Sequence, residues 1–235
     1  MKSTQPPFEP LGCPTLAASW TRSVGWLAAL REGLAAQAPN PSLLTLAAAG
    51  SLGRLEAHEG SDFDLLAISA DDNQDPDSLA PVFALAARLG LALPKHHGIY
   101  RVPLPRARLC PPDGRGRLDE APTVFGKRMA LLLDTRPLWG DAAFRALQSD
   151  VLAWYAAGKF EQAPDAQWGF LLHDLQRYAH AYAGWQRFKF DRDAADAWLL
   201  RQAKLAGSRL LTFAGLLCLL GASSTLGSGK LAFVA

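Results

Sequence analysis

The sequence predicts an α/β protein of the α+β kind, in which a small mixed sheet with flanking helices is followed by a C-terminal helical bundle. Two apolar runs, 43–50 and 63–69, have the composition of strands and are separated by a glycine-rich loop. A segment with helical apolar spacing precedes them, and helical patterns fill the last part of the chain. The expected domains are an irregular arm over 1–14, a sheet-containing domain over 15–145 and a helical domain over 146–235.

Composition limits the class of protein. The chain has 235 residues, of which 49% are hydrophobic and 20% charged, so a substantial core is expected. A net charge of +2 is too small to indicate a nucleic-acid binder, and no DNA partner is expected. The 3 cysteines lie far apart, which is typical of reduced thiols, and no signal peptide is visible, so a cytoplasmic protein is predicted.

Apolar spacing and helix-ending residues define the helical segments. Over 15–38, apolar residues recur every three or four positions until Pro39 and Pro41 end the helix; they are Trp20, Val24, Leu27, Leu30 and Leu34. Residues 124–133 predict a helix or a strand, and 91–110 predict one or two strands interrupted by prolines. Further helices are expected over 79–89, 142–157, 166–188 and 191–221.

The most apolar stretch of the chain lies near its end. The run LLTFAGLLCLLG, residues 210–221, is about a dozen residues long and therefore too short to span a bilayer. It is interpreted as a buried helix, and no membrane partner is expected. After it the sequence turns to glycine and serine, so the helical domain is expected to be a short or truncated one.

Two carboxylates stand where the second predicted strand begins. Asp62 and Asp64 alternate with Phe63 and Leu65, and side chains two residues apart on a strand point to the same face. Two acids on one face repel each other, and a cation offsets that cost. Mg²⁺ prefers a few carboxylates together with phosphate oxygens. The pair therefore predicts a metal site for Mg²⁺ or Mn²⁺.

The loop before these acids supplies groups that suit phosphate. Gly50 allows a close approach of the backbone to a ligand, because it carries no Cβ. Ser51 adds a hydroxyl, and Arg54 adds a fork of donors. A triphosphate held by this turn, with a metal bridging it to Asp62 and Asp64, forms a coherent site for nucleotidyl transfer.

The string GSLGRLEAHEGSDFDLLAIS resembles the signature of the polymerase-β-like nucleotidyltransferase superfamily, and most of all that of the bacterial signal-protein uridylyltransferases. The resemblance implies a catalytic and metal-binding role for Asp62 and Asp64. It implies nucleotide contacts from the preceding loop, namely Gly50, Ser51, Gly53, Arg54 and Ser61. The alternative is a glycine-rich hairpin with a solvated pair of aspartates on an edge strand.

One feature departs from the superfamily pattern. Many members carry a third carboxylate on a later strand, and the sequence has none between Lys95 and Cys110. Asp113 and Asp119 follow in a glycine-rich loop. Without the third carboxylate, an obvious general base or second-metal ligand is missing.

The C-terminal helices also resemble the tail of a bacterial nucleotidyltransferase-like group. The matching residues are Asp174, Arg177, Tyr178, Trp198, Arg201, Lys204, Ser208 and Arg209. Arg177, Arg201 and Lys204 are predicted to form a basic wall that holds nucleotide phosphates or an acceptor. The alternative is an interhelical network with Asp174, Asp193 and Asp196, which needs no ligand.

The function expected from these features is metal-dependent nucleotidyl transfer, in which an NMP moves from an NTP to an acceptor hydroxyl and pyrophosphate is released. The acceptor class stays open between a protein, an RNA and a small molecule, and the base of the NTP is not readable. The alternative is a nucleotide-binding, regulatory or interaction module that keeps the fold and has lost turnover, or a toxin–antitoxin component.

Overall fold

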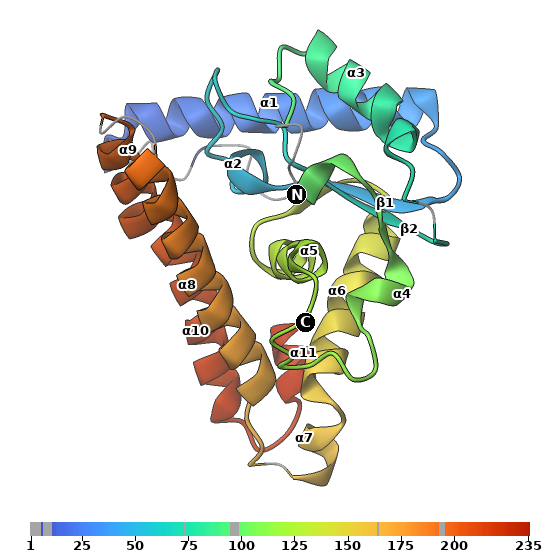
Figure 1. Cartoon of the computed structure of the whole chain (residues 1–235), viewed down its shortest axis with the longest axis vertical. Coiled ribbons are helices and arrows are strands. Elements are labelled where there is room, and N and C mark those ends of the chain that lie inside the picture. Colours follow the sequence, from blue (N-terminus) through green and yellow to red (C-terminus); the bar gives the residue numbers. More distant parts are fainter. Residues whose placement is uncertain (1–5, 7–10, 73, 95–98, 164, 193–195) are drawn as a thin grey trace. The chain divides into compact units, whose positions relative to one another are not determined.

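A computed structural model describes residues 1–235 except 1–5, 7–10, 73, 95–98, 164 and 193–195 (Figure 1). The chain divides into two compact units. The first unit contains residues 1–109 and 123–147, and the second contains 110–122 and 148–235. The segment 110–122 therefore belongs with the helical part of the chain, although it precedes the last helix and strand of the first unit.

The first unit is built around a four-stranded mixed sheet. Its strands are β1 (Leu43–Ala48), β2 (Leu65–Ser69), β3 (Leu104–Pro105) and β4 (Arg136–Trp139), in the order β3-β2-β1-β4. Strand β1 is antiparallel to both β2 and β4, and β2 is parallel to β3. A small mixed sheet with predominantly helical surroundings confirms the predicted α+β class.

Two helices cover one face of this sheet. They are α1 (Pro14–Gln37) and α3 (Ala80–Arg88). The apolar stripe of α1 is buried against alternate residues of the two central strands, and its inner members are Leu27, Leu30 and Leu34. The helix predicted over 15–38 is thereby confirmed, because the periodic apolar residues are the ones that meet the core. The arm predicted over 1–14 lies mostly outside the described residues.

Two strands differ from the prediction. Strand β2 begins at Leu65, so Asp62 and Asp64 precede the strand. The chain there runs beside Ala92, which forms an isolated parallel bridge with Asp62 and accepts a hydrogen bond from the Phe63 N–H. Strand β4 follows the segment 124–133, for which the sequence predicted a helix or a strand, and no strand was predicted at its own position. Because β4 is an edge strand, it tolerates Pro137, which lacks a backbone donor.

Short helices complete the first unit. They are α2 (Gly50–Gly53), α4 (Arg106–Leu109), α5 (Pro122–Leu133) and the 3₁₀ turns Pro76–Leu79 and Ile99–Arg101. The boundary between the units falls within α6 (Asp141–Ala156). Asp75 caps the first 3₁₀ turn, because its side chain accepts a hydrogen bond from the Asp77 N–H.

The second unit is helical. Its elements after α6 are α7 (Lys159–Gln162), α8 (Gly169–Arg192), α9 (Asp196–Lys204), a π-helical turn (Leu205–Arg209), α10 (Leu210–Ser224) and α11 (Lys230–Val234). Helices α8 and α10 lie side by side (Figure 1). Tyr178 meets Phe213 edge-to-face at 6.0 Å between ring centroids, and the Arg209 guanidinium lies 4.6 Å above the Tyr182 ring.

The prediction that residues 210–221 form a buried helix is wrong. Helix α10 exposes Leu210, Leu211 and Leu217, whereas its described buried residues are Leu220 and Ser223. The helical stretch is also longer than the apolar run, because residues on both sides continue it. Within the described part of the chain, Arg201–Ser224 is the one helix long and apolar enough to cross a membrane by length and composition, and 6% of its most apolar window is buried.

Candidate active site

The center of the candidate site is the contact between Gly50 and Asp64. Gly50 opens α2 with a φ of +65°, a conformation that side chains other than glycine rarely adopt. A Cβ built on Gly50 would lie 2.7 Å from the Asp64 Oδ2 atom. The Ala49 N–H also donates a 2.8 Å hydrogen bond to the Asp64 carbonyl. The glycine-rich turn and the second predicted metal ligand are therefore in direct contact.

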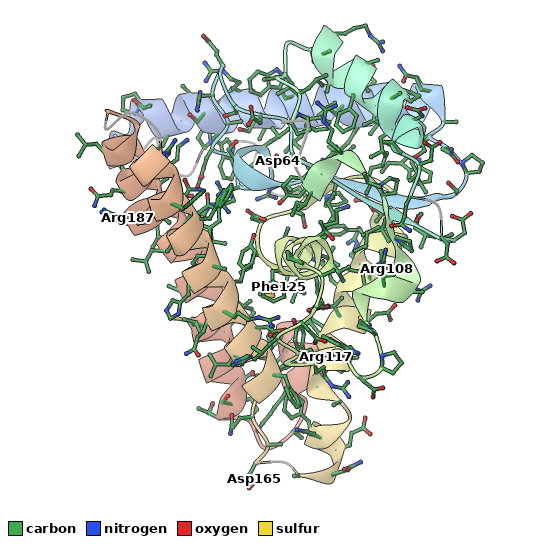
Figure 2. The ribbon with its side chains drawn as sticks, in the orientation of Figure 1. Asp64, Arg108, Arg117, Phe125, Asp165 and Arg187 are labelled. Atoms are coloured by element: carbon green, nitrogen blue, oxygen red, sulfur yellow. The ribbon has the colours of Figure 1, made fainter. Side chains whose placement is uncertain are left out.

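Both aspartates precede β2 and flank a buried anchor. Phe63 is fully buried and meets Phe83 edge-to-face at 6.3 Å in the core under α1 and α3. Because consecutive side chains of an extended segment alternate, Asp62 and Asp64 project away from that core. Asp62 is exposed and Asp64 is half-buried, and Figure 2 shows Asp64 beside α2.

Any metal site here could take protein ligands from two carboxylates, which lie beside a glycine turn. Among the residues that the structure describes, no group of three or more histidine, cysteine, aspartate or glutamate side chains comes together. A divalent cation at Asp62 and Asp64 would therefore take its remaining ligands from water and from phosphate oxygens, which is the coordination that Mg²⁺ prefers. The missing Cβ of Gly50 lets the Asp64 carboxylate lie against the backbone of the turn, 2.7 Å from where that Cβ would be.

Arg54 is held by two carboxylates inside the first unit. Its Nη1 atom lies 2.7 Å from Asp134 Oδ2, and its Nε atom lies 3.0 Å from Glu56 Oε2. The side chain is 12% exposed, and that of Asp134 is 4% exposed. This network joins the loop after α2 to the end of α5. A phosphate contact through Arg54 stays a prediction, and the structure gives this residue a role in holding the turn.

Gly53 and Ser61 also shape the loop. A Cβ on Gly53 would lie 2.1 Å from the Asp134 carbonyl oxygen, so the backbone of α2 approaches the end of α5 too closely for any side chain. The Gly53 carbonyl accepts a 2.8 Å hydrogen bond from Arg136 Nε. Ser61 is buried, and its Oγ atom accepts a 3.0 Å hydrogen bond from the His58 N–H. Their predicted nucleotide contacts remain predictions.

A buried lysine in α5 was missed by the sequence reasoning. Lys127 is 3% exposed, and its ammonium donates a hydrogen bond to the Val102 carbonyl. Burial lowers the pKa of Lys127 to about 8, because the charged form loses hydration. The neighbouring Arg128 is fully buried and donates to the Leu109 carbonyl at 3.0 Å. The signal in the sequence is a pair of cations inside an otherwise apolar helix.

The predicted basic residues of the C-terminal helices all belong to the second unit. Arg177 lies 3.3 Å from the fully buried Asp174 and 3.7 Å from Glu120, and it donates to the Arg117 carbonyl. Asp174 also accepts a 2.7 Å hydrogen bond from the Tyr155 hydroxyl.

Asp174, one of the acids of the alternative network, pairs with Arg177, but this pair lies within α8 rather than between helices. Asp193 lies outside the described residues, as does the side chain of Asp196. On α9, Arg201 is half-buried and Lys204 is exposed. Phosphate binding by Arg177, Arg201 and Lys204 stays a prediction.

The two candidates for a third carboxylate lie in the segment 110–122 of the second unit. Asp119 accepts two hydrogen bonds from Arg117, at 2.8 and 2.6 Å. Hydrogen bonding to Arg117 lowers the pKa of Asp119, since the charged carboxylate is the form that is stabilised.

Comparisons of the chain with protein families, with curated proteins and with solved structures found no match.

Proposed function

We propose that the first unit is a metal-dependent nucleotidyltransferase domain that transfers an NMP from an NTP to an acceptor hydroxyl. The observation that carries the proposal is the contact between Gly50 and the Asp64 carboxylate, where a Cβ would lie 2.7 Å from Oδ2. A glycine turn whose backbone N–H groups suit phosphate adjoins a carboxylate with affinity for a cation. That combination suits a nucleoside triphosphate with its metal.

In this proposal the chain acts mainly by positioning and charge. Asp62 and Asp64 hold the metal, which neutralises charge on the triphosphate when bound. The Gly50 backbone and the Ser51 hydroxyl hold the β- and γ-phosphates. The acceptor oxygen forms a bond to the α-phosphorus, the bond from this phosphorus to the bridging oxygen breaks, and pyrophosphate leaves with the electron pair while the hydroxyl proton is released.

The salt-bridge network around Arg54 supports this arrangement by fixing the turn. Asp134 and Glu56 hold the arginine from two sides, and Gly53 lets α2 approach the end of α5. A phosphate-binding turn works best when its backbone is already in the bound geometry, because little entropy is then lost on binding. Arg54 therefore serves the proposed site as a positioning residue.

The second candidate is a nucleotide-binding or regulatory module that has lost turnover, of which a toxin–antitoxin component is one form. Two observations favour it. The segment 95–110 contains no carboxylate that could act as a general base, and Arg54 is already paired with two acids. Binding without pyrophosphate release would distinguish this candidate from the active enzyme.

The test is a thermal-shift titration of the native chain with each of the four NTPs and Mg²⁺. A ligand that binds the folded state alone raises the melting temperature as ln(1 + [L]/Kd) increases. The variant Asp62→Asn/Asp64→Asn should lose the Mg²⁺-dependent part of the shift. A control with two exposed carboxylates removed after β2, Asp72→Asn/Asp77→Asn, should keep it.

The nucleotide that gives the largest shift is then supplied with a label at its α-phosphate. Transfer of label with release of pyrophosphate supports the enzyme. A metal-dependent shift without pyrophosphate release supports the binding module. No shift with any of the four NTPs contradicts the enzyme and the nucleotide-binding module, and favours a regulatory or interaction module that has lost nucleotide binding.

A further inference from the structure

The outer side of α10 is apolar and exposed. The inner side of this helix meets α8 through Phe213 and holds the buried Leu220 and Ser223. The residues on the outer side are exposed and uncharged, and we call them the outer face of α10: Leu210, Leu211, Gly215, Leu217, Gly221 and Ala222. Leu211 is 72% exposed and Leu210 is 55% exposed. A contiguous apolar surface of this kind marks an interaction site.

A bilayer is a poor occupant, although the helical stretch Arg201–Ser224 that contains α10 is long enough to cross one. The end of α10 is fixed inside the second unit, because Trp168 Nε1 donates a 2.7 Å hydrogen bond to the buried Ser223 Oγ. The neighbouring helix α8 carries the ion pair of Asp174 and Arg177. Insertion of α10 would pull these polar groups into hydrocarbon, where unpaired charges and unsatisfied donors are costly.

We propose that the outer face of α10 binds the same face of a second copy of this chain, with the two helices antiparallel about a two-fold axis near Leu216. In this register each large side chain lies level along the axis with a small residue of the other copy. Leu210 lies level with Ala222, Leu211 with Gly221, and Leu217 with Gly215, since each pair is symmetric about position 216. An isologous interface requires this self-complementarity.

Charge also favours the antiparallel arrangement. The cations of this helical stretch lie in its first part, at Arg201, Lys204 and Arg209, and no aspartate or glutamate occurs from Ala197 to Ala235. A parallel pair would place these cations beside one another. In the antiparallel pair they lie toward the carboxyl end of the other α10, where the helix dipole favours positive charge.

The first test is sedimentation equilibrium of the intact chain over a range of concentrations. The native chain should form a dimer. Leu211→Glu places one carboxylate per copy in the proposed interface, so two per dimer, and should weaken dimerisation about 100-fold. Leu118→Glu, at a leucine that is 86% exposed on the segment 110–122, should leave dimerisation unchanged. Circular dichroism checks that both variants fold.

A monomeric native chain at every concentration overturns the proposal, as does a Leu211→Glu variant that dimerises like the native chain. Flotation with anionic and neutral vesicles provides the other arm. If the native monomer binds vesicles and Leu211→Glu does not, the outer face contacts lipid, which also overturns the proposal.

The second test reads the direction of the helices by disulfide formation. Ala214 and Cys218 are symmetric about position 216, so Ala214→Cys should form a cross-link between Cys218 of one copy and the new thiol of the other under mild oxidation. The native Cys218 should not cross-link with its own equivalent, because the two thiols are offset by about 6 Å along the axis. Cross-linking of native Cys218 with itself would show a parallel pair and overturn the antiparallel assignment. The control Ala214→Cys/Cys218→Ala should stay uncross-linked.

Discussion

The turn at Gly50 and the outer face of α10 differ in whether their side chains bond within the chain or face solvent. Around the turn, polar groups are matched inside the unit, since Arg54 meets Asp134 and Glu56 and the Gly53 carbonyl accepts from Arg136. On α10, leucines face outward. We therefore propose a small anionic ligand for the turn and another protein surface for the outer face of α10.

Substitutions in these two regions should also affect different properties of the protein, namely folding and association. A change in the turn breaks contacts within one copy of the chain, so it should lower the free energy of unfolding. A change at Leu211, which is 72% exposed on the outer face of α10, should alter association and leave folding nearly unchanged.

Breaking the Arg54 network should have the largest effect on stability. Arg54→Gln removes the ion pair of Arg54 with the Asp134 carboxylate, which is 4% exposed, and this should cost about 4 kcal/mol in chemical unfolding. Arg22→Gln is the matched control. Arg22 reaches the exposed Glu59 at 3.5 Å, and loss of such a surface pair should cost less than about 1 kcal/mol. Equal losses for the two variants would mean that the Arg54 pair contributes no more than a solvated one.

Gly53→Ala should have the next largest effect. The added methyl group would lie 2.1 Å from a backbone oxygen, that of Asp134, which cannot move without displacing the end of α5. We expect a loss of about 3 kcal/mol in the free energy of unfolding. Gly25→Ala in α1 is the control, because no atom lies within 4 Å of the built Cβ.

In α1, Gly25→Ala should stabilise the protein by about 0.5–1 kcal/mol. Opposite signs for the two substitutions would establish that close backbone contact, rather than glycine flexibility, determines the residue at position 53. A neutral Gly53→Ala would contradict the close approach of α2 to α5.

Burial of Lys127 should make the free energy of unfolding depend on pH in a defined direction. Its pKa is lowered to about 8 in the folded protein, below the usual value of a lysine, so above pH 8 the unfolded chain binds more protons. The stability of the folded state should therefore rise as pH increases, by about 1.5 kcal/mol between pH 8 and pH 9.5. The rise should be absent in Lys127→Met, and the exposed Lys204→Met should retain it. Urea unfolding at several pH values measures this directly.

Sequence patterns predicted the parts of the fold that local spacing determines. The apolar stripe of α1 is periodic and the apolar runs of β1 and β2 are continuous, and each pattern matches one element. Strand β4 was missed because Pro137 and Gly140 indicate a break, and only pairing with β1 makes that segment extended. The proximity of Gly50 and Asp64 could be predicted from the order of residue types along the chain. The partner of Arg54 could not, since Asp134 lies eighty positions away.

The sequence did not predict which residues of α10 are buried and which are exposed. Leucines at every position look alike whether they meet a core or solvent, and the helix has apolar residues on both sides. Leu220 and Leu211 provide the sharpest test, because both are leucines of α10 and are 4% and 72% exposed.

Leu220→Ala should cost about 3 kcal/mol in unfolding, since it removes buried methyl groups and leaves a cavity. Leu211→Ala should change stability by less than about 0.5 kcal/mol when measured at protein concentrations low enough to keep the chain monomeric. At high concentration, where the dimer is populated, Leu211→Ala should lower the melting temperature, because the dimer adds stability by mass action. A cost for Leu211→Ala that does not depend on protein concentration would show instead that this leucine packs within its own chain.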